Sequence, residues 1–283
     1  MRFTKKQYPG FTLIELLVVI SILSILIGLV SVIANSVLKS AKTATESSAL
    51  RAMLQAYNLY AFEHNGKVMP GYWPVDEVVR GANGEVLTGV KAKRYVWRLY
   101  PYLDDAMSTL YVNDQQPILS QVVGSECYPY VASLYPSFGL NCEWLGGDDR
   151  ITARIETKFL SDIKHPSRQL VFASARVPQS HSGEDHSDCI DGGISMKMEG
   201  WYEIKSPYYP TTDWRWNVAN GEHAHAPTAN SADHGYLSAR HEGKVIAGQI
   251  DGSVNYLTIK ELADMRRWAP RATSADWIPV SNP

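Results

Sequence analysis

An uncharged apolar run near the start of the chain limits what this sequence can fold into. No side chain between Leu16 and Ala34 carries a charge, and leucine, isoleucine and valine predominate there. As a helix these residues would measure about 28 Å, close to the thickness of the hydrocarbon layer of a bilayer. Arg2, Lys5 and Lys6 precede the run and no acidic residue does, so the positive-inside rule places the N-terminus in the cytoplasm. The run therefore predicts one membrane-spanning helix.

A cleaved secretory signal peptide and a plain signal anchor are two simpler interpretations of this run. A secretory signal has a shorter apolar region, of about 7–15 residues, followed by a small-residue cleavage site. Val32-Ile33-Ala34 is the nearest approach to such a site, and it matches poorly. Glu15 stands directly before the run, where a carboxylate in lipid costs about 2.5–3.5 kcal/mol. Neither interpretation explains this glutamate or the Pro9-Gly10-Phe11 step before it.

The residues around Glu15 resemble the class III signal of type IV prepilins and type II secretion pseudopilins. A basic leader is followed by Gly10, then by Phe11-Thr12-Leu13-Ile14-Glu15 and the long apolar run. The resemblance implies that a membrane aspartyl prepilin peptidase cleaves between Gly10 and Phe11 and that Phe11 is then N-methylated. It also implies that Glu15 is an assembly residue, whose carboxylate pairs with the ammonium of a neighbouring subunit. A buried ion pair of this kind is suited to setting register.

The same resemblance implies a structural subunit of a type II secretion pseudopilus or a type IV pilus, and not an enzyme. Its expected partners are the prepilin peptidase, other pilin or pseudopilin subunits, the inner-membrane assembly platform and membrane lipid. The expected location is the inner membrane, crossed once, with a head in the periplasm or in an extracellular filament. The formal net charge of −2 gives no reason to expect nucleic acid as a partner.

The helix is expected to continue beyond the apolar run with a different pattern. Apolar residues recur at intervals of three and four up to Ala61, which indicates an amphipathic helix that Asn65-Gly66 ends. The charged residues of this stretch are expected on its other faces: Lys39, Lys42, Glu46 and Arg51. The sequence thus predicts a leader at 1–10, a transmembrane and assembly helix at 11–34, its amphipathic continuation at 35–64, and an extracytoplasmic head at 65–283.

The head is predicted to be a loop-rich α+β domain in which the long helix packs on a small antiparallel sheet, as in pilin-like proteins. Its best strand candidates are residues 95–99, 168–173, 201–204, 244–250 and 253–257. Asp251-Gly252 joins the last two strands as a hairpin turn. Thr258 and Glu261 form a capping box that begins a short helix, expected to reach about Trp268.

A histidine precedes this hairpin turn at a spacing that also resembles known proteins. Many large pilin-like proteins carry a C-terminal pattern of His, nine residues and Asp-Gly, matched here by His241, Asp251 and Gly252. An imidazole oriented by a carboxylate can act as a general base. No serine or cysteine nucleophile signature stands near, so a structural pair that closes the hairpin is the favoured interpretation.

Three groups of residues are candidate metal or disulfide sites. Asp185, Asp188 and Asp191 lie in an acidic loop that could bind calcium, as a loop of major pseudopilins does, although a solvated loop is the simpler interpretation. The histidines could ligate a transition metal, or could simply lie on the surface: His223, His225, His234 and His241. A Cys127–Cys142 disulfide suits an extracytoplasmic domain and would leave Cys189 over, although the sequence allows any other pairing of the three.

An aromatic group leaves open a rival function of a different class. Tyr208-Tyr209 and Trp214-Arg215-Trp216 fit either a core or a surface that binds carbohydrate or a partner. The rival interpretation is a binding module or an enzyme displayed on the membrane by a pilin-type leader. It predicts a deep pocket lined by His241, His223 or these aromatic residues.

Overall fold

The computed structural model describes residues 12–104, 106–151, 155–179, 199–208, 216–217 and 230–278, and of residues 31–33 it describes the backbone. Contacts between Cα atoms divide the chain into two compact units, Met1–Ala44 and Thr45–Pro283. The second unit is the head, and it includes the later part of the long helix.

The long helix α1 extends from Leu13 to Glu63 without interruption, which confirms the expected helix over the described residues. Proline is absent from it, and Gly28 is its single glycine. The helix ends where Asn65 takes a left-handed conformation, with φ of 56°. The backbone N–H of Gly66 then donates to the carbonyl of Ala61 at 2.7 Å, which is the long-range bond of a Schellman cap.

The head contains one antiparallel sheet of four strands, in the order β1-β2-β3-β4. The strands are β1 (Phe138–Leu140), β2 (Leu170–Ser174), β3 (Lys244–Gln249) and β4 (Val254–Thr258). Ala247 at the middle of β3 is opposite Ala173 of β2 and Asn255 of β4. The expected α+β class, with a long helix and a small antiparallel sheet, is confirmed.

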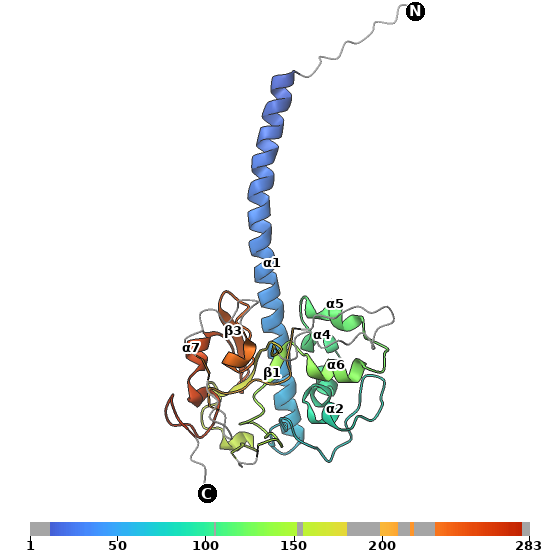
Figure 1. Cartoon of the computed structure of the whole chain (residues 1–283), viewed down its shortest axis with the longest axis vertical. Helices are drawn as coiled ribbons and strands as arrows, with labels where there is room; N and C mark the ends of the chain where they lie inside the picture. Colours follow the sequence, from blue (N-terminus) through green and yellow to red (C-terminus); the bar gives the residue numbers. More distant parts are fainter. Residues whose placement is uncertain are drawn as a thin grey trace, which may run out of the picture. The chain divides into compact units, whose positions relative to one another are not determined.

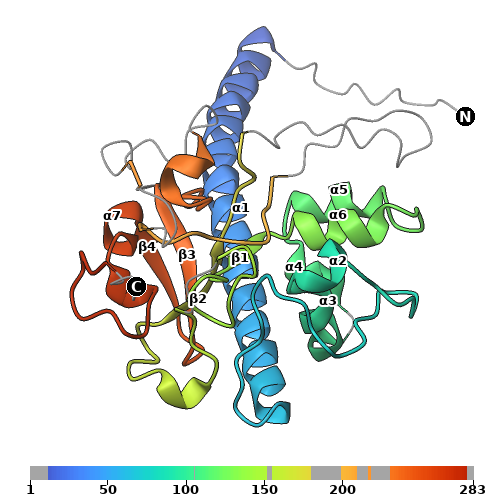
Figure 2. The ribbon, with the colours of Figure 1, turned by 60° about the horizontal axis from the view of Figure 1, so that its bottom comes forward.

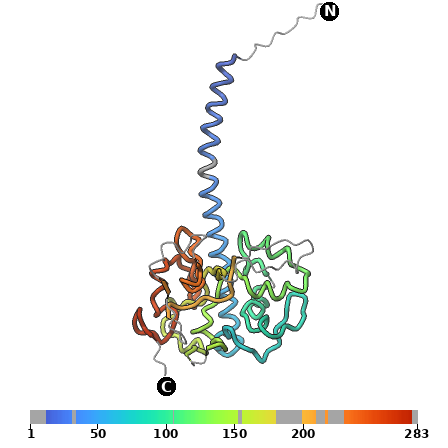
Figure 3. The backbone as a smooth tube through the Cα atoms, in the orientation of Figure 1, coloured from blue at the N-terminus to red at the C-terminus, as the bar shows by residue number. Residues whose placement is uncertain are grey.

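Short helices make up much of the remaining head. The α-helices are α2 (Val90–Lys93), α3 (Val96–Leu99), α4 (Met107–Leu110), α5 (Gln115–Ser120), α6 (Tyr128–Leu134) and α7 (Ile259–Leu262). The 3-10 turns are η1 (Tyr100–Leu103), η2 (Leu160–Asp162), η5 (Ser231–His234) and η6 (Met265–Arg267). Figure 3 traces the head in chain order, from the end of α1 through the green helical segment to the orange and red hairpin.

Within the head, α1 lies between the sheet and the short helices that precede it in the chain. Figures 1 and 2 show β3 and α7 on one side of α1, and α2, α4, α5 and α6 on the other. Because both sides are covered, α1 buries a wide stripe of apolar side chains there. The fully buried ones are Leu50, Met53, Leu54, Tyr57 and Ala61.

A glycine in β3 allows α1 to approach the sheet closely. A Cβ atom at Gly248 would lie 2.9 Å from Cδ1 of Leu54 and 3.1 Å from Cγ of Leu50. The ring of Tyr57 meets the ring of Phe172 in β2 edge-on, with 5.7 Å between centroids. The contact between α1 and the sheet therefore depends on a position without a side chain.

Three secondary-structure predictions in the head were wrong or incomplete. Within the predicted strand at 95–99, residues 96–99 form α3 instead. The whole stretch is buried, so its pattern has no periodicity that distinguishes a helix from a strand. Residues 201–204 contribute a single bridge, in which Glu203 pairs with Leu140. The helix after Thr258 stops at Leu262, and Asp264 caps the separate turn η6 by accepting from the N–H of Arg266 at 2.9 Å.

The close approach at Gly248 gives a first prediction. Gly248→Val should lower the free energy of unfolding by about 2 kcal/mol, because the new methyl groups overlap Leu50 and Leu54. Denaturant unfolding of the full chain in detergent measures the change. Lys244→Val, which places the same side chain at the exposed first residue of β3, should change it by less than about 0.5 kcal/mol. Equal effects of the two substitutions would contradict the packing argument.

Candidate functional site

The carboxylate of Glu15 closes the N-terminal end of α1. The backbone N–H and the hydroxyl of Thr12 both donate to Oε2 of Glu15 at 2.8 Å, and the N–H of Glu15 donates to Oγ1 of Thr12 at 3.3 Å. These reciprocal bonds form a capping box. Sequence reasoning named Glu15 but missed Thr12, although the T-x-x-E spacing was the available signal. Gly10 and Phe11, the two residues of the predicted cleavage site, lie outside the described residues.

The α1 residues that follow expose apolar side chains on all sides. Every large apolar side chain described from Leu13 to Val30 is at least 44 % exposed. The hydroxyls of Ser21 and Ser24 donate to carbonyls one turn back, so they need no outside partner. Among the described residues, α1 is the one helix long and apolar enough to cross a membrane, judged by length and composition. A surface of this kind needs lipid or protein to cover it.

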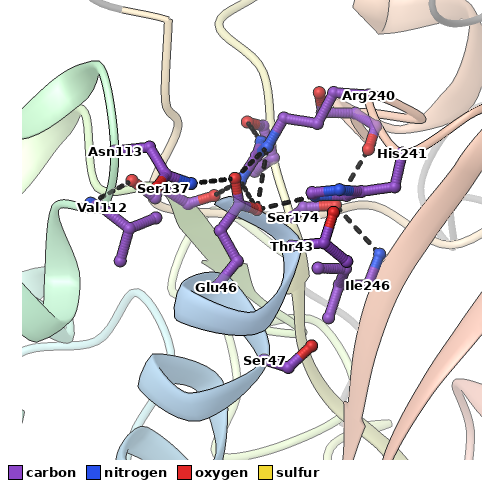
Figure 4. Close-up of polar contacts among 12 residues, drawn as sticks. Thr43, Glu46, Ser47, Val112, Asn113, Ser137, Ser174, Arg240, His241 and Ile246 are labelled. Atoms are coloured by element: carbon purple, nitrogen blue, oxygen red, sulfur yellow. Dashed lines mark hydrogen bonds and ion pairs between the residues drawn. The ribbon is translucent and has the colours of Figure 1, made fainter. Parts of the chain in front are cut away.

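A second glutamate of α1, Glu46, is buried in the head at the centre of a polar cluster (Figure 4). Its Oε2 accepts from Nη2 of Arg240 at 2.8 Å and lies 2.8 Å from Nε2 of His241. Its Oε1 accepts from Nδ2 of Asn113 at 2.9 Å. Burial alone would raise the pKa of Glu46, but the charge of Arg240 and the hydrogen bonds from His241 and Arg240 lower it to about 2.

Arg240 extends this cluster to two strands of the sheet. Its guanidinium donates to the carbonyl of Ala175, just after β2, at 3.3 Å and to the carbonyl of Ser137, just before β1, at 3.2 Å. The sequence analysis placed Glu46 on a face away from the core, and that prediction was wrong. Glu46 precedes Leu50 by one turn and so shares the buried stripe, a spacing that could have indicated it.

The predicted structural pair of His241 and Asp251 does not form. His241 contacts Glu46, and its backbone pairs with Lys244 at the base of the hairpin. Asp251 lies at the other end of β3, where its Oδ1 accepts from the N–H of Ser253 at 2.9 Å. A strand of six residues separates the two positions by roughly 20 Å. The hairpin turn itself is confirmed, with φ of 86° at Gly252.

The predicted Cys127–Cys142 disulfide is also wrong. Cys127 is disulfide-bonded, whereas Cys142 is a free, buried thiol. Burial raises the pKa of the Cys142 thiol well above its usual value. The Cβ atom of Cys142 packs against Gly71, at a point where a methyl group on Gly71 would overlap it. Cys189 lies outside the described residues.

Most residues of the two predicted metal sites lie outside the described residues, namely Asp185, Asp188, Asp191, His223 and His225. In the part of the chain that the structure does describe, no three His, Cys, Asp or Glu side chains are grouped to hold a metal ion. His234 is buried, and its Nε2 lies 3.1 Å from the carbonyl of Asn217.

Of the aromatic group, Trp216 belongs to the core of the head. Its ring meets the ring of Trp268 edge-on, with 5.6 Å between centroids, and its Nε1 donates to the carbonyl of Lys205 at 3.2 Å. Tyr208 packs against the core and is partly buried. Tyr209, Trp214 and Arg215 lie outside the described residues.

A small cavity of about 70 Å³ lies beside the Glu46 cluster. Its lining includes Asn113, Gln115, Arg176, Glu199 and Arg240. Neither a histidine nor an aromatic ring is among the described residues that line it. The cavity therefore differs from the pocket that the displayed-enzyme or carbohydrate-binding interpretation predicts.

A third carboxylate, Glu143, is fully buried and was missed by sequence reasoning. Its Oε2 lies 3.0 Å from the hydroxyl oxygen of Ser206, which also lies 2.7 Å from the carbonyl of Tyr208. The backbone N–H of Ser206 also donates to Oε2 of Glu143, at 3.3 Å. Burial raises the pKa of Glu143 to about 8, against the lowering effects of Lys205 and Ser206.

Residues 5–31 match the family model of the prokaryotic N-terminal methylation motif. The match covers the predicted cleavage site, Glu15 and most of the apolar run, and it supports a class III signal of the prepilin and pseudopilin type. Together with the apolar part of α1, it is consistent with a protein that crosses the membrane once. The chain matches no curated protein and no solved structure.

Removing the charge of Glu46 should destabilise the head. In Glu46→Gln, Arg240 would lose its ion-pair partner and His241 would lose its carboxylate hydrogen-bond partner, so we expect a loss of about 3 kcal/mol in the free energy of unfolding. Denaturant unfolding measures it. The matched control is Glu126→Gln at an exposed position, with an expected change below about 0.5 kcal/mol. A Glu46→Gln variant as stable as the control would show that the cluster does not stabilise the packing of α1 in the head.

Glu143 should make stability fall as the pH rises. Its pKa is about 8 in the folded chain, against a usual value of 4.5, so between these pH values the folded state holds a proton that the unfolded state has released. The free energy of unfolding should then fall by up to about 1.4 kcal/mol per pH unit, and this contribution should level off above pH 8. Urea unfolding from pH 5 to 8 measures it. Glu143→Gln mimics the protonated acid and should flatten the profile; an unchanged profile would refute the assignment.

Proposed function

We propose that this chain is a structural, non-catalytic subunit of a type IV pilus or a type II secretion pseudopilus. The methylation motif at residues 5–31 is the observation that carries the proposal. The apolar part of α1 supports it, because a helix exposed on all sides can pass from lipid into a bundle of like helices. The head would then be carried in the periplasm or outside the cell.

The proposed sequence of events begins on the inner face of the membrane. A prepilin peptidase cleaves between Gly10 and Phe11, which removes the basic leader and creates an α-amino group at Phe11. N-methylation of Phe11 and delivery to an inner-membrane assembly platform follow. The new ammonium stands four residues before Glu15 in the sequence.

The capping box supports a role for Glu15 in joining subunits. Thr12 donates two bonds to Oε2 of Glu15, and within the described part of the chain Oε1 accepts none. The carboxylate is thus held in one orientation with an oxygen left for the ammonium of a neighbouring subunit. A buried ion pair between apolar helices is better suited to setting the register of neighbouring subunits than to stabilising their contact.

Intact mass and N-terminal sequencing of the protein from host membranes test this proposal. Wild type should begin at methylated Phe11, whereas Gly10→Ala should keep residues 1–10. Glu15→Ala should be processed like wild type but should fail to enter filaments. Glu126→Ala, at an exposed position of the head, is the control for assembly. A wild-type chain that still carries its first ten residues would exclude the prepilin role.

A further inference from the structure

The cavity beside Glu46 is lined by two buried polar groups that the head itself does not use. Ser238 is 7 % exposed and Gln115 is 9 % exposed, and both line the cavity. The hydroxyl of Ser238 and the Nε2 nitrogen of Gln115 make no hydrogen bond with any described residue. Buried polar groups normally have a partner, because an unpaired donor costs free energy. The cavity therefore offers two donors to a molecule inside it.

The amide of Gln115 is oriented so that its nitrogen is available. Gln115 begins α5, and its Oε1 accepts from the backbone N–H of Glu199 at 3.2 Å. Because the amide oxygen is used in this way, both hydrogens of Nε2 are left for another acceptor. Nη1 of Arg240 donates to the carbonyl of Ala175 at 3.3 Å, which leaves its second hydrogen for the cavity. Several donors around one small space suit a carboxylate.

One carboxylate of the lining has no counter-charge. Glu46 is paired with Arg240. Asp114 and Arg176 also line the cavity, and each has an interaction partner of its own. Glu199 is exposed, and it forms no ion pair with any residue in the described part of the chain. The charge left over at the cavity is therefore negative, and it attracts a cationic group such as an ammonium.

The volume of the cavity limits the size of its occupant. A water molecule needs about 10–15 Å³ of such volume. The 70 Å³ of this cavity therefore holds roughly five to seven groups of that size. Glycine and alanine are molecules of these dimensions, whereas leucine is too large.

We propose that this cavity binds a small zwitterion of the size of glycine or alanine. The ammonium of the ligand lies at Glu199. Its carboxylate accepts from Nε2 of Gln115, the hydroxyl of Ser238 and the guanidinium of Arg240. Gln115 belongs to α5, whereas the N–H of Ser238 donates to Ser174 of β2, so the ligand joins the short helices to the sheet. The site lies within the head and goes beyond the proposed function.

Isothermal titration calorimetry of the full chain in detergent tests the proposal. Wild type should bind glycine or alanine. Acetate lacks the ammonium, methylamine lacks the carboxylate, and leucine exceeds the volume of the cavity. Each of these three should bind at least about tenfold more weakly than the better of the two small amino acids, because each loses a charged contact or does not fit.

Two variants assign the binding to this cavity. Ser238→Ala removes a donor to the carboxylate and should weaken binding about tenfold. Glu199→Gln removes the partner of the ammonium at an exposed position and should weaken it about fivefold. The matched controls Ser167→Ala and Glu126→Gln, both at exposed positions of the head, should bind like wild type. Unfolding temperatures measured without ligand show whether each variant is folded, and bound ligand should raise that of wild type.

Four outcomes would overturn the proposal. The first is no binding of glycine or alanine, which would mean that the cavity holds water only. The second is leucine binding as tightly as the smaller molecules, which would place the site elsewhere. The third is acetate binding as tightly as glycine, which would indicate an anion site. The fourth is a folded Ser238→Ala or Glu199→Gln variant that binds like wild type. Cleavage and filament assembly do not enter the measurement, so the outcome is independent of the proposed function.

Discussion

The contact of Leu50 and Leu54 in α1 with Gly248 in β3 is the constraint on which the head depends. A side chain at Gly248 would push the helix away from the sheet, and the rings of Tyr57 and Phe172 would lose their edge-on contact. Interiors are packed as densely as organic crystals, so a shift at this point would be transmitted to the short helices on the far side of α1. The sheet and the short helices on the far side of α1 come from different parts of the sequence, and α1 joins them.

The polar cluster adds direction to this apolar contact. Apolar packing alone would tolerate a helix that slides or rotates by a small amount, because dispersion and burial are not directional. Glu46 removes that freedom, since its two oxygens are matched by donors from Arg240, His241 and Asn113. His241 therefore contacts α1 and not the turn ten residues later. His241 and Asp251 lie at opposite ends of β3, at the base of the hairpin and at the Asp-Gly turn.

Features set by neighbouring residues were the ones the sequence could predict. The methylation motif, the uninterrupted helix and the capping box of Thr258 and Glu261 are all local, and each was identified from adjacent residues. The partners of Glu46 could not be found in this way, because 194 residues separate it from Arg240. The predicted strand at residues 95–99 was wrong for another reason: in a fully buried stretch, helix and strand patterns look alike. The cysteine pairing failed because spacing along the chain does not show which thiol is buried.

The burial of Cys142 affects how a chain with three cysteines can mature in an oxidising compartment. Disulfide exchange proceeds by attack of a thiolate that can reach another sulfur. Cys142 is buried, and burial favours the protonated form of its thiol, so the residue meets neither condition. Once the head has folded, Cys142 cannot exchange with the disulfide of Cys127 or cross-link one molecule to the next. The odd number of cysteines is therefore compatible with the proposed filament, in which many copies would lie side by side.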